Sequence, residues 1–139
     1  MPKPKKEIIS KREKLMTMVA EMAKSPAKFS KVMLGHELFK YNAEYADSTE
    51  RFLIYRSGRQ AGKTMTTAVK AIHWSFFAPI MSKDAREKKE AVIIIAAPTQ
   101  NQASIMFDRI RTLVKNSDFL SQYVVRSTQT EMWIQWLNK

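Results

Sequence analysis

The loop over residues 57–64 contains the residue types that bind phosphate. Its residues are Ser57, Gly58, Arg59, Gln60, Ala61, Gly62, Lys63 and Thr64. Glycine lets the backbone take conformations that other residues avoid, so several N–H groups can converge on phosphate oxygens at the start of a helix. In such a loop we expect Lys63 to contact the β- and γ-phosphates and Thr64 to place its hydroxyl on Mg²⁺. The loop therefore predicts a nucleotide site.

The segments on either side of the loop are those that a phosphate-binding loop requires. Residues 52–55 are apolar β-formers and predict a short buried strand, while residues 64–77 have the spacing of a helix that Pro79 should end. The consensus GxxxxGK[ST] has its first glycine where this chain has Ser57. The alternative interpretation is a Gly-containing turn with a solvated lysine.

A second apolar segment follows the helix. Residues 91–97, AVIIIAA, lack polar alternation, which is typical of a strand buried on both faces. Strand, helix and strand predict a βαβ unit with a right-handed crossover onto a parallel sheet. At the end of the second strand, Thr99 and Gln100 either contact DNA or relay the nucleotide state. Alternatively, Thr99 or Asn101 caps the helix that is expected over residues 101–115.

The first fifty residues predict helices. Residues 7–24 repeat apolar side chains at helical spacing beside a cluster of lysines, and shorter helices are expected over residues 26–34 and 37–46. The basic helix either contacts nucleic acid or a partner subunit, or is an ordinary helix with a solvated face. Tyr41 and Asn42 either contact an adenine base or belong to the core.

The composition indicates a folded protein with a polyanionic partner. The chain has 139 residues, 45% of them hydrophobic, and residues 1–33 carry +6 of its net charge of +11. It has no cysteine, and the isolated His36 and His73 predict no metal site. No apolar run could span a membrane and the N-terminus does not resemble a secretory signal, so we expect a non-secreted, cytoplasmic protein.

The carboxylate that phosphoryl transfer requires is not evident. Such a group follows a second apolar strand and holds Mg²⁺. No apolar run in this chain ends in Asp or Glu, including residues 123–127 and 132–137, which predict a strand hairpin or an extension of the sheet edge. We therefore expect nucleotide binding without efficient turnover. Residues 1–50 are expected to form a basic helical segment and residues 51–139 the first part of an ATPase domain.

Three stretches together carry a family resemblance. They are the Arg59-Gln60 pair in the loop, the run VIIIAAPTQNQASIMFDRIRTL, and DFLSQY followed by MWIQWLNK. From about residue 51 to residue 139 the chain resembles the N-terminal part of the large terminase subunit of tailed phages and related viruses. In that family a Walker B strand with a catalytic Glu and a nuclease domain follow downstream, and neither is evident here.

The resemblance implies an α/β fold with an incomplete, RecA/ASCE-like P-loop NTPase core on a parallel sheet, preceded by N-terminal helices. It implies an ATP and Mg²⁺ site at Lys63 and Thr64, with Arg59 either a finger arginine or an exposed loop cation. The parent protein would be a motor that hydrolyses ATP to move double-stranded DNA into a procapsid. It would work in the host cytoplasm with a portal protein and a small terminase subunit, in a homo-oligomeric ring.

Two other functions fit the same sequence. The run VIIIAAPTQNQ also resembles a strand of superfamily 1 and 2 helicases. The net charge of +11 and the missing carboxylate also fit a non-catalytic fragment that binds nucleic acid.

Overall fold

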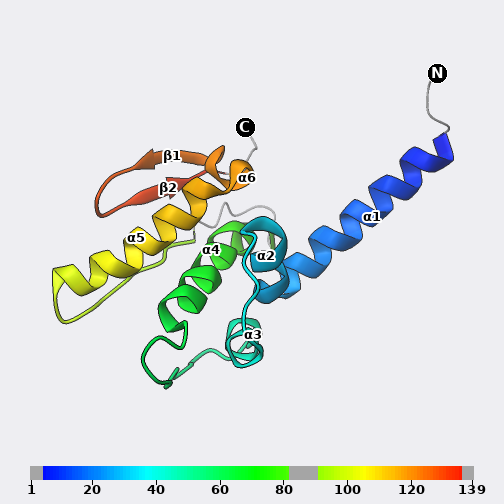
Figure 1. Ribbon diagram of the computed structural model, residues 1–139. Helices are drawn as coiled ribbons and strands as arrows, with labels where there is room; N and C mark the ends of the chain where they lie inside the picture. Colours follow the sequence, from blue (N-terminus) through cyan, green and yellow to red (C-terminus); the bar gives the residue numbers. More distant parts are fainter. Residues whose placement is uncertain (1–4, 82–90, 136–139) are drawn as a thin grey trace.

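The computed structural model describes residues 5–81 and 91–135, which form helices and one strand hairpin (Figure 1). The helices precede the hairpin along the chain. The elements are α1 Lys5–Lys24, α2 Pro26–Met33, α3 Lys40–Asp47, α4 Lys63–Met81, α5 Gln100–Asn116, α6 Asp118–Ser121, β1 Val124–Ser127 and β2 Met132–Ile134. Within the described ranges, no helix is long and apolar enough to cross a lipid bilayer.

The N-terminal helices form much as the sequence predicts. α1 extends away from the rest of the molecule, and α2 begins at Pro26 after the N-cap Ser25 (Figure 1). The Ser25 hydroxyl accepts from Lys28 N at 3.2 Å and donates to the Asp47 carboxylate at 2.9 and 3.0 Å. Asp47 also accepts from Ala27 N at 2.9 Å. The end of α3 is thereby joined to the start of α2.

α4 lies at the centre of the helical packing, where it contacts α2, α3 and α5. Its buried face meets apolar side chains from α1, α2, α5 and α6. The buried core cluster consists of Met22, Phe29, Ala68, Ile72, Phe76, Phe77, Ile110, Val114 and Leu120. The prediction that Pro79 ends α4 is wrong, because the helix continues to Met81. Proline near a helix end removes only one backbone hydrogen bond, to the carbonyl four residues earlier.

The predicted parallel-sheet P-loop core is not formed. The sheet in the described part of the chain is the two-stranded antiparallel hairpin of β1 and β2. Residues 52–55 and 91–97 are free of helix and strand, and the exposed fractions of Phe52, Ile54 and Ile94 are 83%, 91% and 84%. An apolar segment becomes a buried strand only when neighbouring strands form hydrogen bonds with its backbone N–H and C=O groups and other elements cover its side chains. The described residues supply no such neighbour for either segment.

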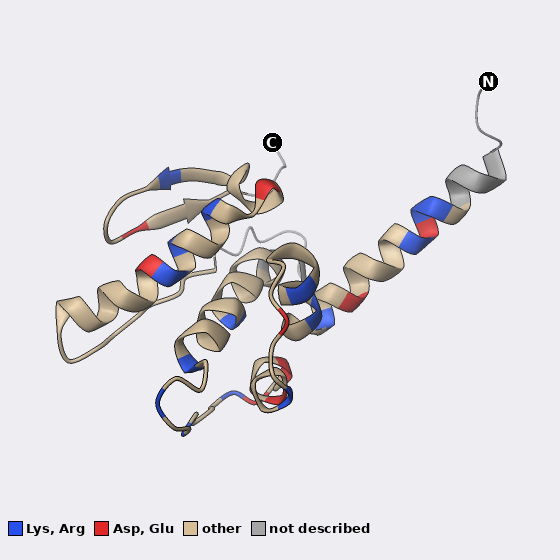
Figure 2. Cartoon of the chain, viewed as in Figure 1, with Lys and Arg blue, Asp and Glu red and all other residues tan. Residues whose placement is uncertain are grey.

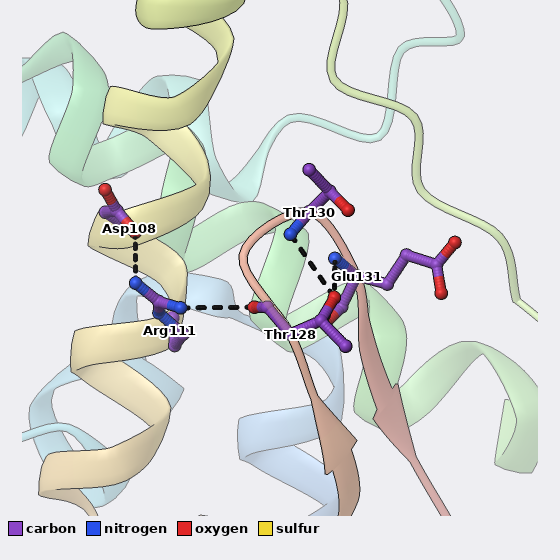
Figure 3. A network of polar contacts seen from close by, with 5 residues as sticks. All are labelled: Asp108, Arg111, Thr128, Thr130 and Glu131. Atoms are coloured by element: carbon purple, nitrogen blue, oxygen red, sulfur yellow. Dashed lines mark hydrogen bonds and ion pairs between the residues drawn. The ribbon is translucent and has the colours of Figure 1, made fainter.

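The predicted hairpin is confirmed, and side chains from α5 hold its turn. Val124 pairs with Ile134 and Ser127 with Met132. Arg111 on α5 donates from Nη1 to Thr128 O at 3.1 Å and from Nη2 to the Asp108 carboxylate at 2.6 Å (Figure 3). These bonds dock the turn that joins β1 to β2 against the helix.

The turn is also closed by its own side chains. The Thr128 hydroxyl accepts from Thr130 N at 3.3 Å and from Glu131 N at 3.0 Å (Figure 3). A side-chain oxygen that accepts backbone N–H groups in this way satisfies donors that the strand ladder leaves unpaired. Threonine at this position therefore suits the turn.

A buried histidine joins α4 to the end of α1. The Nε2 atom of His73 lies 2.9 Å from Met22 O, and the ring packs edge-on against Phe29 at 5.5 Å. Because a carbonyl can only accept, His73 donates from Nε2. Burial lowers the pKa of His73 below its ordinary value of 6.5, the backbone bonds and Asp47 oppose that shift, and Lys70 adds to it.

We predict that this histidine makes the fold less stable in acid. Since its pKa is lowered in the folded state, the unfolded chain takes up the proton first as pH falls below about 6.5. The contribution to stability is complete above that pH and decreases as pH falls toward the folded-state pKa. Urea unfolding of His73→Gln between about pH 7 and 5 should show a smaller loss than the unchanged chain. His36→Gln, at an exposed position, is the control, and equal losses in all three proteins would contradict the assignment.

Candidate nucleotide-phosphate site

The loop over residues 57–62 leads directly into α4. Lys63 is the first residue of this 19-residue helix, and the first turn contains no acidic residue. A helix N-terminus carries partial positive charge and free N–H groups, which favour an anion. Residues 51–70 carry five Lys or Arg and no Asp or Glu, and Figure 2 shows basic positions along the loop and the start of α4. All charged side chains of the loop and of the first turns of α4 are therefore basic.

The backbone of the loop turns at two residues with positive φ. Gln60 has φ 59° and Gly62 has φ 81°. Only glycine takes such angles without steric cost, so Gly62 suits the last turn before the helix. Its carbonyl then accepts from Thr66 N and from Thr66 Oγ1, both at 2.9 Å. These bonds begin the helix directly after the loop.

The side chain of Lys63 folds back over the loop. Its ammonium donates to Ser57 O at 2.6 Å and to Gly58 O at 2.7 Å. Both acceptors are neutral carbonyls, so no carboxylate bonded to this ammonium compensates its charge. The Ser57 hydroxyl beside it is buried and has no hydrogen-bond partner among the described residues. The lysine is therefore held in the loop, and no carboxylate among the described residues pairs with its charge.

Three other side chains of the loop, those of Arg59, Gln60 and Thr64, differ in exposure. Arg59 and Gln60 are exposed, and Thr64 is half-buried. Within residues 5–81 and 91–135, neither the Arg59 guanidinium nor the Thr64 hydroxyl forms a hydrogen bond or an ion pair. Each can reach a ligand without first breaking a bond to the described part of the protein.

The structure brings Tyr41 and Asn42 to the loop. Both lie on α3, and both donate to Ala61 O, Asn42 from Nδ2 at 3.1 Å and Tyr41 from its hydroxyl at 3.4 Å. Asn42 is buried, with 2% of its surface exposed, whereas Tyr41 is about half exposed. The two predicted adenine contacts therefore contact the loop backbone.

A third residue at this contact was not among the predicted site residues. The hydroxyl of Tyr55 donates to Asn42 Oδ1, and its ring stacks on Tyr45 with centroids 4.2 Å apart. The sequence predicts Tyr55 only as a member of an apolar strand. Its hydroxyl could not be assigned in advance, because no spacing in the chain relates residue 55 to residue 42.

Lys70 fixes the other end of α3. Its ammonium donates to Ala46 O and Ser48 O, both at 2.7 Å. Burial lowers the pKa of Lys70, and the nearby Asp47 carboxylate opposes that shift. A cation at the last carbonyls of a helix is favourable, so this bond stabilises α3 and its connection to α4.

Thr99 and Gln100 lie at the start of α5. The Thr99 hydroxyl accepts from Gln102 N at 3.3 Å, so Thr99 is the N-cap, the alternative that the sequence left open. Gln100 is the first residue of the helix and is exposed. No hydrogen bond between described residues joins this pair to the loop.

Comparison with protein-family models, curated proteins and solved structures finds no match to this chain. The residues in the described ranges also contain no group of three or more His, Cys, Asp or Glu side chains placed to hold a metal ion. A hydroxyl such as that of Thr64, together with phosphate oxygens and water, can nevertheless complete a Mg²⁺ shell.

We predict that the two loop glycines respond differently to alanine. A Cβ at Gly62 would lie 2.8 Å from Asn42 Nδ2 at a φ of +81°, whereas a Cβ at Gly58 would meet nothing within 4 Å. Gly62→Ala should cost about 1–3 kcal/mol of unfolding free energy, while Gly58→Ala should change it by less than about 1 kcal/mol. Urea denaturation of both variants measures the difference, and equal losses would contradict the described turn.

Proposed function

We propose that residues 57–64 bind the phosphates of ATP with Mg²⁺. The observation that supports this most strongly is the Lys63 ammonium, which is held by two neutral carbonyls at a helix N-terminus. The absence of Asp and Glu from residues 51–70 supports the same site. The proposal rests on the loop and helix alone, since the parallel sheet that was expected around them is not formed.

Three residues of the loop have a role in this proposal. Lys63 exchanges its two carbonyl acceptors for oxygens of the β- and γ-phosphates, a charge-assisted bond that is stronger than the neutral ones it replaces. The Thr64 hydroxyl would be a Mg²⁺ ligand, and the ion would supply positive charge to the phosphates when bound. Arg59, exposed on the loop, is placed to approach the γ-phosphate as a finger arginine.

We further propose that the chain is the ATP-binding portion of a viral large terminase subunit. Its support is the resemblance of residues 51–139 and the cationic loop. On this proposal the parent protein uses ATP to move double-stranded DNA into a procapsid in the host cytoplasm, as a ring with a portal protein and a small terminase subunit. We expect little turnover from this chain, since no apolar run ends in the carboxylate that hydrolysis requires.

A second candidate function is nucleic-acid binding without nucleotide chemistry. The net charge of +11 favours it, and exposed Lys and Arg residues lie along α1 (Figure 2). Contacts to phosphates in DNA or RNA weaken steeply as salt rises. Salt-sensitive DNA binding that Lys63→Ala leaves unchanged would favour this function over the first.

We predict that Lys63→Ala weakens binding of a fluorescent ATP analogue with Mg²⁺ by at least about tenfold. Hydrogen bonds to charged groups contribute about 1.5–3 kcal/mol, and 1.4 kcal/mol corresponds to a factor of ten. Phosphate release followed in the same samples should stay near background.

The matched control is Lys115→Ala, which removes the same charge from an exposed position in the last turn of α5. It should bind the analogue like the unchanged chain. Equal weakening in both variants would mean that net charge, rather than the loop, attracts the nucleotide. No binding by the folded, unchanged chain would exclude the loop as a working nucleotide site.

A further inference from the structure

Both polar atoms of the Asn42 amide form hydrogen bonds inside the protein. Nδ2 donates to Ala61 O at 3.1 Å, and Oδ1 accepts from the Tyr55 hydroxyl. Asn42 belongs to α3, Tyr55 to the extended segment before the loop, and Ala61 to the loop itself. One buried side chain therefore connects the three parts of the chain that meet at this loop.

The same side chain also sets the space beside the last turn of the loop. Asn42 Nδ2 would lie 2.8 Å from a Cβ at residue 62, so the Gly62 backbone passes directly against the amide. Gly62 is at φ 81° and precedes the helix that carries Lys63 and Thr64. A displacement of Asn42 would therefore move the turn from which both phosphate-site residues follow.

We infer that Asn42, held by Tyr55, is a positioning residue that sets the phosphate loop and does not recognise the nucleotide base. A base contact requires an amide with free donors and acceptors at the surface. In Asn42, Oδ1 and one of the two Nδ2 N–H donors are already bonded to Tyr55 and Ala61. The exposed fraction of Asn42 is 2%, so the second N–H is not at the surface to meet a base.

This assignment predicts how nucleotide affinity responds to mutation, and in that respect it rests on the proposed nucleotide function. A contact to the base would increase the affinity only for ligands that carry the correct base. A loop that is held in place increases the affinity for every ligand with a triphosphate, because all of these ligands have the phosphates in common. Loss of the Asn42 contact should therefore weaken ATP, GTP and inorganic triphosphate by the same factor.

Two substitutions test the assignment at opposite ends of the contact. Tyr55→Phe removes the hydroxyl that holds Asn42, and Asn42→Asp keeps an acceptor for Tyr55 but loses the donor to Ala61 O. The matched control is Tyr45→Phe, since Tyr45 stacks on Tyr55 and its hydroxyl makes no hydrogen bond to another described residue. Circular dichroism of each variant verifies the helical fold.

The binding measurement is calorimetric titration of each protein with ATP, GTP and inorganic triphosphate in the presence of Mg²⁺. Tyr55→Phe should weaken all three ligands by the same factor, about two- to tenfold for the loss of one neutral hydrogen bond. Asn42→Asp should weaken all three at least as much, because it also adds a negative charge near the phosphates. Tyr45→Phe should weaken none. Weakening of ATP alone, with inorganic triphosphate unchanged, would overturn the inference in favour of an adenine contact.

A second readout needs no ligand. In ¹⁵N-labelled protein, the steady-state heteronuclear NOE of the Ala61 and Gly62 amides should fall in Tyr55→Phe and Asn42→Asp, and stay unchanged in Tyr45→Phe. If the unchanged chain binds none of the three ligands, the proposed function fails and this NOE alone decides the inference. Equal NOE values in all four proteins would overturn it.

Discussion

The burial of α4 is the constraint on which the rest of the structure depends. Ala68, Val69, Ile72 and Phe76 on this helix are fully or almost fully buried, and burial of a large apolar side chain contributes about 1.5–3 kcal/mol. The helices that cover this face are α1 and α2, which precede α4 in the sequence, and α5 and α6, which follow it. Because the loop over residues 57–62 is continuous with the first turn of α4, the packing that fixes the helix axis also fixes the direction in which the N-terminal N–H groups point.

The helix alone would leave the loop free to move, and α3 supplies the second anchor. α3 is bonded to α2 through Asp47 and Ser25, and to α4 through Lys70. From this fixed position Asn42 reaches Ala61 and lies against Gly62. The loop is therefore supported at both ends, by its own helix and by a neighbour whose position is set independently. A phosphate site gains affinity from such support, because less conformational freedom is lost when the ligand binds.

The helices could be predicted from the sequence, because the spacing of apolar residues and the capping residues that favour a helix are local in the chain. The helix expected over residues 26–34 is observed as α2, which begins at Pro26 after the N-cap Ser25. The prediction of a parallel sheet was wrong because strand formation depends on partners that are distant in the sequence. The segments around Ile54 and Ile94 are as apolar as buried strands, yet both side chains are exposed. Lys63 and Thr64 could be proposed as site residues from their spacing alone, and that assignment stays a prediction. The roles of Asn42 and Tyr55 could not, because they depend on how α3 and the loop meet in space.

The most direct test of the central claim is the ¹H–¹⁵N amide spectrum of the intact chain, recorded with and without ATP and Mg²⁺. A phosphate site built from the loop and the start of α4 predicts that the largest changes occur at residues 57–64, with smaller ones at Asn42. Changes confined to α1, or no change at saturating ATP, would contradict the claim that this loop binds phosphate.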